Sequence, residues 1–208
     1  MEDYETLNVS QYSCPECAAS DRDRLYALYA MHMLNNPDGT VLRILDIAPA
    51  PVLSGFLRSL PNARYRSADL FSPMADDKVD IMDMNLYTDE SFDLIICSHV
   101  LEHVRDDAKA MSELYRVLAK GGSAILMVPI LLTATETDED PDEPSVDERW
   151  ARFGQDDHVR MYARHDFLAR LEQAGFHVDA LGTGAFGEGV FKQHGITEQS
   201  VLYIGRKA

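Results

Sequence analysis

Two aspartates stand where apolar runs end, which is where parallel strands present groups to ligands. Asp46 closes the run that starts at Val41, and Asp69 follows a second run over residues 63–68. Their spacing is close to the roughly 20 residues that separate the first turn of a dinucleotide-type site from the acidic residue on its ribose. A carboxylate suits two vicinal hydroxyls because it accepts hydrogen bonds and donates none. The pair indicates a site for a ribose-containing ligand; an N-cap is the alternative for Asp69.

A later segment supplies candidates for proton transfer and binding. His158, Arg160 and Tyr162 alternate with Val159 and Met161, which predicts one polar face on an extended stretch. His158 can take a proton from a substrate hydroxyl because an imidazole titrates near neutrality. Arg160 can clamp a carboxylate or a phosphate, with Tyr162 on the same face. The alternative is an ordered edge that caps the next helix.

His103 is a second candidate base. It follows the apolar run over residues 92–98 and stands directly before a predicted helix, where a structural role is the alternative. A group transfer to an atom that is already nucleophilic needs mainly alignment of the two partners, so the alternative is a site without a dedicated base.

Cys14 and Cys17 have the spacing of half a tetrahedral zinc site. The third cysteine, Cys97, lies in a predicted core strand, so a closed site would need histidines such as His32 or a second chain. The alternative is a capped turn before a helix. No metal ligand is assigned, and three cysteines are too few for a disulfide framework, which favours a reducing compartment.

Apolar periodicity predicts the elements that position these residues. We expect strands at 41–46, 63–68, 79–84, 91–98, 124–130, 176–181 and 200–205, and helices at 21–34, 52–60, 106–118 and 164–174. Alternating strands and helices favour a parallel sheet with right-handed crossovers.

Helix ends are predicted from the same pattern. The first helix carries an apolar stripe that includes His32, which we expect to be a packed core histidine, and residues 35–39 should end that helix. Gly121 should end the third helix as a left-handed cap, and Gly175 should do so for the fourth.

The sequence motifs resemble one protein family. DIAPAP, SADL, IMDM, SFDLIICSHVLEHV and ELYRVLAKGGSAILMVPI are similar to the ordered motifs of class I S-adenosylmethionine-dependent methyltransferases of the methyltransferase-domain type. The resemblance runs from about Val41 to Ile130, with a tail to Lys207. It implies a Rossmann-like α/β fold with a seven-stranded, mostly parallel sheet flanked by helices. The last strand would insert antiparallel between the fifth and sixth, residues 41–208 would form the domain, and residues 1–40 an N-terminal arm and helix of the same unit.

The resemblance also implies roles for individual residues around S-adenosylmethionine. The methionine part would lie against Asp46 and Ala48, the ribose against Asp69 and Leu70, the adenine against Asp83 and Met84, and the sulfonium and substrate near Ser98 and His99, which joins the catalytic candidates. The chain departs from the family at the turn after Asp46, where Ala48-Pro49-Ala50-Pro51 replaces the usual glycines. A β-carbon narrows the approach to a ligand, and proline removes a donor.

The segment over residues 131–157 departs from the α/β pattern because it is densely acidic. We expect a solvated, mobile charge run, or a lid at the ligand end of the fifth strand that could hold a divalent cation. Residues 182–189 are glycine-rich, but no strand-to-helix passage follows, so we expect a flexible connection.

Overall charge and hydropathy limit the function classes. The net charge of −16 disfavours binding to a nucleic acid backbone, and the sequence has neither a membrane-span pattern nor a signal-peptide pattern. We expect a soluble, cytoplasmic S-adenosylmethionine-dependent methyltransferase that transfers the methyl group to a small molecule, at an oxygen atom. The competing hypothesis is a catalytically inactive binding or partner module with the same fold.

Overall fold

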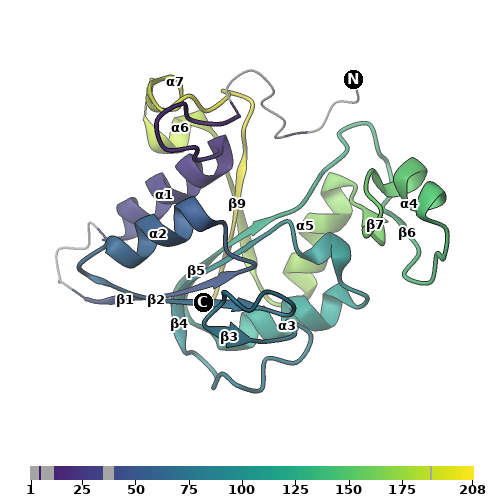
Figure 1. Ribbon diagram of the computed structural model, residues 1–208, viewed down its shortest axis with the longest axis horizontal. Helices are drawn as coiled ribbons and strands as arrows, with labels where there is room; N and C mark the ends of the chain where they lie inside the picture. Colours follow the sequence, from purple (N-terminus) through teal and green to yellow (C-terminus); the bar gives the residue numbers. More distant parts are fainter. Residues whose placement is uncertain (1–4, 6–11, 35–39, 188) are drawn as a thin grey trace.

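The computed structural model describes residues 5, 12–34, 40–187 and 189–208. A seven-stranded sheet forms its centre, with the strand order β3-β2-β1-β4-β5-β9-β8 (Figure 1). The strands are β1 (Leu42–Ile47), β2 (Ala63–Asp69), β3 (Asp77–Lys78), β4 (Phe92–Ser98), β5 (Leu118–Met127), β8 (His177–Leu181) and β9 (Leu202–Arg206). All neighbours pair in parallel except β9, which is antiparallel to both β5 and β8. The predicted fold class and the insertion of the last strand are confirmed.

Strands β1 and β4 form the centre of the hydrophobic core. Ile44 pairs with Leu94 and Ile47 with Cys97, and none of these four side chains is more than 3% exposed. Such continuous apolar runs are typical of strands covered by helices on both faces. Their shared carboxyl ends are therefore held at one rigid edge of the sheet.

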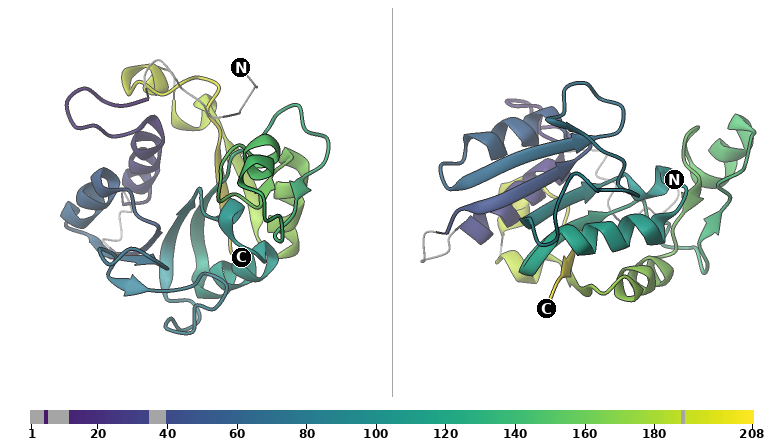
Figure 2. Two further views of the ribbon diagram at one scale, coloured as in Figure 1. Left: turned by 45° about the vertical axis from the view of Figure 1, so that its right-hand side comes forward. Right: turned by 90° about the horizontal axis from the view of Figure 1, so that it is seen from below.

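Two helical layers cover the sheet. Helices α1 (Asp21–Leu34) and α2 (Pro51–Ser59) lie on one face, and α3 (Asp107–Val117) and α5 (Arg164–Gln173) lie on the other (Figure 1, Figure 2). Ser20 and Asp23 begin α1 with a reciprocal capping box, in which each side chain accepts from the other's backbone N–H.

The buried face of α1 differs from the predicted stripe. Leu25, Tyr26, Tyr29 and Ala30 are buried, whereas His32 is exposed. The prediction of a packed core histidine is wrong because the helix turns its face towards positions 26 and 30, which the stripe did not include.

The predicted third strand over 79–84 is also wrong. Strand β3 spans only Asp77–Lys78, although Ile81 and Met84 are buried. The Asp80 carboxylate accepts from Met82 N–H, and the Asp80 carbonyl accepts from Asp83 N–H. A side chain that satisfies its own backbone in this way favours a turn over a ladder.

Gly121 takes the left-handed conformation that its position predicts, but not as a helix cap. Helix α3 ends at Val117 and β5 begins at once, so Gly121, with φ +72°, lies inside β5. The pairing with β4 changes register at this end of the strand, between Phe92 and Leu94. The glycine therefore serves a bulge. Gly175, with φ +106°, follows α5 as predicted.

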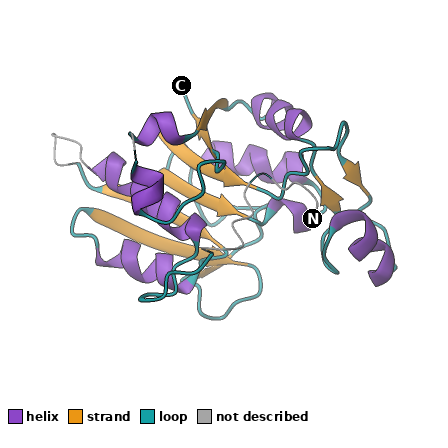
Figure 3. Ribbon diagram, turned by 90° about the horizontal axis from the view of Figure 1, so that it is seen from above, coloured by secondary structure: helices purple, strands orange, loops and turns teal. Residues whose placement is uncertain are grey.

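The acidic segment forms structure of its own beside the sheet (Figure 3). Strand β6 (Asp138–Glu139) pairs antiparallel with β7 (Arg160–Met161), and helix α4 (Val146–Phe153) lies between them in the chain. Arg152 pairs with Asp138 at 2.6 Å, and Arg105 with Asp142 at 2.8 Å. The acidic run is thus mostly exposed, as expected of a solvated segment, but it contains regular structure and several of its carboxylates have arginine partners.

The glycine-rich segment is likewise more ordered than expected. It contains the short helix α6 (Thr183–Phe186), and α7 (Val190–Gln193) follows it near α1 (Figure 1). Arg24 of α1 donates to the carbonyls of His194 and Gly195. Within the described ranges, no helix combines the length and the apolar character needed to cross a bilayer.

Two expectations concern segments outside the described residues. They are the loose arm at the start of the chain, apart from Glu5, Tyr12 and Ser13, and the stop signal over 35–39. Glu5 itself is buried and accepts a 2.6 Å hydrogen bond from the Tyr203 hydroxyl of β9.

Candidate active site

A cavity of about 340 Å³ opens at the carboxyl ends of β1 and β4. Its floor comes from the two strand ends, one wall from the turn over residues 47–53, and the other from the start of α1 and the turn before it. The Tyr26 hydroxyl of α1 lies 2.7 Å from the Ser98 hydroxyl of β4, so the helix closes over the strand end. Asp46, Ala48, Ser98 and His99 all line this cavity, as predicted for one site.

The turn after β1 accommodates the missing glycines through Ala48. This residue has φ +51°, the left-handed conformation that glycine adopts without strain, and its N–H donates to the Ala68 carbonyl of β2. Pro51 is the first residue of α2, where no N–H is needed, and Ala50 provides no side-chain cap. The first turn of α2 therefore borders the cavity without a side-chain cap.

Asp46 is the most perturbed acid of the cavity. It is 2% exposed, and the Tyr65 hydroxyl donates to its Oδ2 at 2.7 Å. Burial raises the pKa of Asp46 to about 7, and the nearby Asp23 carboxylate adds to the shift. A buried carboxyl group of this kind favours a cationic partner, because the partner stabilises its charged form.

The segment over residues 131–163 brings His158 to His103, and Glu102 links this pair to His99. His99 lines the cavity, and its Nδ1 lies 3.1 Å from Glu102 Oε1 in the short 3₁₀ helix η1 (Leu101–His103). The rings of His103 and His158 meet edge to face, with centroids 4.6 Å apart. His158 is 6% exposed, and burial lowers its pKa, so its ring is held neutral near pH 7.

Asp69 and Leu70 do not line the cavity but lie beside its turn. Strand β2 pairs with β1 up to Ile47 and Ala68, which puts Asp69 next to Ala48. Asp69 Oδ1 accepts from the N–H groups of Phe71 and Ser72. Its carboxylate shapes the following loop, so a loop-capping role stands beside the predicted ribose role.

Asp83 and Met84 also lie outside the cavity. Met84 is fully buried, and its N–H donates to Glu113 Oε2 at 2.7 Å, whereas Asp83 is exposed. The cavity thus unites the residues predicted for the methionine part and does not contain those predicted for the ribose and the adenine.

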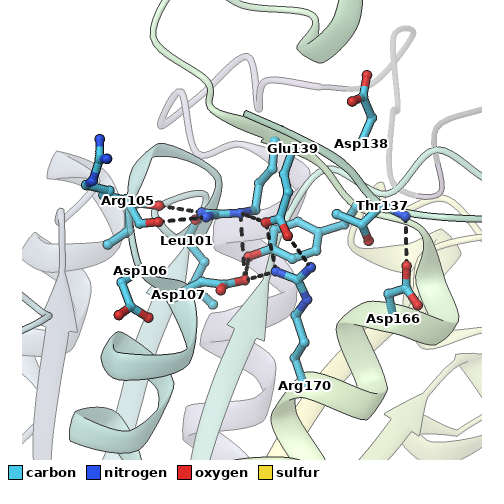
Figure 4. A network of polar contacts seen from close by, with 12 residues as sticks. Leu101, Arg105, Asp106, Asp107, Thr137, Asp138, Glu139, Asp166 and Arg170 are labelled. Carbon is cyan, nitrogen blue, oxygen red and sulfur yellow. Dashed lines mark hydrogen bonds and ion pairs between the residues drawn. The ribbon is translucent and has the colours of Figure 1, made fainter. Parts of the chain in front are cut away.

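Arg160 is not placed to clamp a substrate. It is 1% exposed, and its guanidinium donates to the backbone carbonyls of Leu101, Val104 and Arg105 and to Glu139 Oε2 (Figure 4). The substrate-binding assignment is corrected: Arg160 fastens β7 to the chain around η1. Residues 158–162 are all buried, so this extended segment presents no exposed polar face to a substrate.

Tyr162 has a structural partner as well. Its hydroxyl donates to Asp107 Oδ2 at 2.6 Å, and Arg170 of α5 pairs with both Asp107 and Glu139, each at 2.8 Å (Figure 4). Tyr162 is fully buried, so its prediction as a substrate-binding residue is corrected too. The group of Asp107, Glu139, Arg160 and Arg170 anchors the acidic segment to α3 and α5.

The residues of the wall formed by α1 and the turn before it were missed from the sequence. Tyr12, Ser20, Arg22, Asp23 and Tyr26 line the cavity. The capping box at Ser20 and Asp23 was a readable signal for where α1 begins, and the charged pair Arg22 and Asp23 follows it directly. Periodicity alone described only the apolar face of that helix.

The cysteine pair lies in the turn that leads into this wall. Backbone N–H groups of Cys17 and Glu16 lower the pKa of the Cys14 thiol. The only grouping of three potential metal ligands among the described residues contains neither cysteine, and His32 is not part of it. The zinc hypothesis thus gains no third ligand from the described chain.

A sequence profile of the methyltransferase domain family matches residues 18–181. The chain therefore belongs to this family, in the class I S-adenosylmethionine-dependent type that its motifs resemble. Among curated proteins, no significant match to this chain was found.

Solved structures with the same fold have different activities. The [4+2]-cyclase SpnF is 17% identical, with 98% of this chain and 87% of that chain covered and a TM-score of 0.61. The CurJ carbon methyltransferase is 17% identical with a TM-score of 0.58; the match covers 89% of this chain and 54% of that one, so the chain spans about half its length. An S-adenosylmethionine-dependent methyltransferase from Mesorhizobium loti is 16% identical, with 89% and 98% covered and a TM-score of 0.55. At these identities the likeness shows the fold alone.

The left-handed conformation of Ala48 should strain the turn after β1. Ala48→Gly should raise the free energy of unfolding by about 0.5–1 kcal/mol, because relief of the left-handed strain exceeds the added entropy of the unfolded chain. Ala48→Val should lower it. Urea denaturation of the three proteins measures both effects, and a destabilised glycine variant would contradict the assignment of strain to this residue.

The buried guanidinium of Arg160 should contribute strongly to stability. Arg160→Leu should lower the free energy of unfolding by about 3 kcal/mol, because it leaves carbonyls and a carboxylate unpaired. Thermal unfolding should shift by roughly 6–12 °C. Arg105→Ala is the matched control, since Arg105 and Asp142 are both exposed, and its midpoint should not move. Equal effects of the two changes would refute the anchoring role.

Proposed function

We propose that this protein binds S-adenosylmethionine and transfers its methyl group to an oxygen atom of a small molecule. The observation that carries the proposal is the buried Asp46, whose pKa is raised to about 7 by burial, in a cavity that His99 also lines. The cofactor offers an amino group and a sulfonium as cations for such a carboxyl group. The cluster beyond His99 offers a proton acceptor for a hydroxyl.

The cofactor's methionine part fits the charges of the cavity. Asp46 and Asp23 suit its amino group, and Arg22 suits its carboxylate. The turn at Ala48 would carry the ribose towards Asp69. Leu70 and Phe71, which are 38% and 88% exposed, provide apolar surface for the adenine near Asp69, with the exposed Asp83 at its border.

The reaction would be an in-line displacement at the methyl carbon. The acceptor oxygen forms a bond to the methyl group while the bond from methyl to sulfur breaks, and the sulfur keeps the electron pair as S-adenosylhomocysteine. The proton of the hydroxyl passes to the ring of His158 or His103, and Ser98 and His99 border the reacting centre. Alignment of the two partners supplies much of the acceleration in such a transfer.

The fold does not select the acceptor atom, since similar folds belong to a carbon methyltransferase and to a cyclase. The oxygen assignment rests on the histidines next to the cavity. To test this assignment, the protein is incubated with methyl-labelled cofactor and with small molecules that carry either hydroxyl or carbon acceptors, and transfer of the label is measured. Transfer to carbon acceptors alone would overturn the assignment. Absence of cofactor binding at millimolar concentration would leave only the partner-module hypothesis.

Cofactor affinity should depend on pH through Asp46. Because its folded pKa of about 7 lies above its unfolded value, protonated Asp46 stabilises the unliganded fold at low pH, and this contribution is lost as pH rises through 7. A cationic ligand needs the ionised form, so affinity should rise by up to about tenfold per pH unit below 7. Calorimetric titration of the wild type and of Asp46→Asn from pH 5.5 to 7.5 measures this. The variant should bind more weakly with a flat profile, and a parallel slope in both proteins would contradict the role.

The ribose assignment has a separate test. Asp69→Asn keeps one acceptor oxygen for the Phe71 and Ser72 N–H groups and loses the carboxylate charge. It should weaken cofactor binding by about ten- to a hundredfold, as expected for a hydrogen bond to a charged group. Asp147→Asn, at an exposed position in α4, is the matched control. Unchanged affinity in Asp69→Asn would limit that residue to capping its loop.

A further inference from the structure

A carboxylate and two imidazoles converge beyond the cavity. Glu102, His103 and His158 each offer one ligand atom, and these three atoms all lie within 4.8 Å of one another. Glu102 and His103 are neighbours in η1, whereas His158 comes from the segment that begins after β5. Side chains from two distant parts of the chain thus meet at one point.

One carboxylate oxygen of Glu102 is buried without a hydrogen-bond partner among the described residues. Glu102 is 1% exposed, and its Oε1 faces His99 Nδ1 at 3.1 Å. Its Oε2 is buried and has no hydrogen-bond partner among the described residues. Buried polar atoms are nearly always satisfied, so an unsatisfied carboxylate oxygen beside two imidazoles indicates a missing cation.

His158 is oriented as a metal ligand is. His158 Nδ1 lies 2.9 Å from the Phe153 carbonyl, which can only accept, so Nδ1 carries the proton and Nε2 keeps its lone pair. His103 Nδ1 lies 3.2 Å from the Asp157 carboxylate, within ion-pair distance. Ligating histidines typically donate their other N–H to a carbonyl or a carboxylate in this way.

The anchor of the acidic segment holds the third ligand in place. Val159 N–H donates to the Glu102 carbonyl at 2.9 Å, and Arg160 donates to the Leu101 and Val104 carbonyls on both sides of η1. His158 is therefore fixed against the two ligands of η1 by the residues that follow it. Rigid support from such a shell is what a metal site needs.

We propose that Glu102, His103 and His158 bind one divalent first-row transition metal ion. Two imidazoles and one carboxylate suit Zn²⁺, Mn²⁺, Fe²⁺ or Co²⁺ better than Mg²⁺ or Ca²⁺, which prefer all-oxygen sites. Three protein ligands leave coordination positions open for an exogenous group, the pattern of a catalytic rather than a structural site. His99 both lines the cavity and contacts Glu102, so the open positions adjoin the place proposed for the acceptor.

The ion gives the proposed function a defined acceptor chemistry, and this part of the inference rests on that function. A hydroxyl bound to a divalent cation loses its proton more easily than a free one. Because the rings of His103 and His158 are then bound to the ion, the proton passes to solvent and not to either ring. The substrate class would then be small molecules with a hydroxyl that can coordinate a metal, such as catechols or hydroxy acids.

Metal binding can be tested without turnover. Chelator-treated protein is titrated with Zn²⁺ and with Co²⁺, and binding is followed by calorimetry and by the visible absorption of Co²⁺. We expect one ion per chain and a higher unfolding midpoint in the presence of metal. Glu102→Gln and His158→Asn should each weaken binding by at least about a hundredfold, since loss of a ligand exceeds the ten- to hundredfold effect of supporting residues.

Matched controls separate this site from others. His177→Ala removes an exposed histidine, and Cys14→Ser with Cys17→Ser removes the thiol pair; both should keep full binding. Because Gln fits the buried position without a charge, Glu102→Gln should fold in the absence of metal and lose only the metal-induced rise in the midpoint. No binding by the wild type, or loss of binding in the cysteine variant alone, would overturn the proposal.

The outcome is independent of the proposed methyl transfer. Cofactor binding is measured in the metal-free protein, where the cavity around Asp46 is intact. A protein that binds the cofactor but no metal disproves the metal site alone, and one that binds metal but no cofactor disproves the methyltransferase proposal alone.

Discussion

The central constraint on this structure is that β1 and β4 must be buried on both faces. Their leucines and isoleucines can leave water only between two helical layers, so the two strands lie side by side at the centre of the sheet. Both strands run in the same direction, and their carboxyl ends therefore meet at one edge. Asp46 and Ser98 reach the same cavity for this reason, although they are far apart in the sequence.

The parts of the fold that follow from burial could be predicted from the sequence. The sheet and helix α1 agree with the structure because long apolar patterns determine them. The placement of the last strand agrees as well, and it was expected from the family resemblance. The errors lie where local polar contacts decide the backbone. Asp80 turns the chain where a strand was expected, and Gly121 forms a bulge where a helix cap was expected. Such contacts depend on the local backbone geometry, which cannot be read from the apolar periodicity of the sequence.

The candidate site also contains residues that the sequence predicts and residues that it does not. The strand-end residues Asp46 and Ser98 were predictable because topology places them. Arg160 and Tyr162 were assigned to a substrate because polar residues at alternating positions usually face outwards. Here the acidic segment folds over them and supplies Glu139, so the polar side chains become buried partners. A pattern of polarity cannot tell an exposed face from one that another part of the chain covers.

The division of the site between two parts of the chain has a consequence for how this protein can diverge. The cavity is lined by residues within 12–26, 46–53 and 96–99, and the side chains of Glu102, His103 and His158 meet beside it. His99 connects the two parts by lining the cavity and contacting Glu102. The segment that carries His158 can be exchanged or lengthened without changing a residue that lines the cavity, whereas His99 limits how far the two parts of the site can change independently.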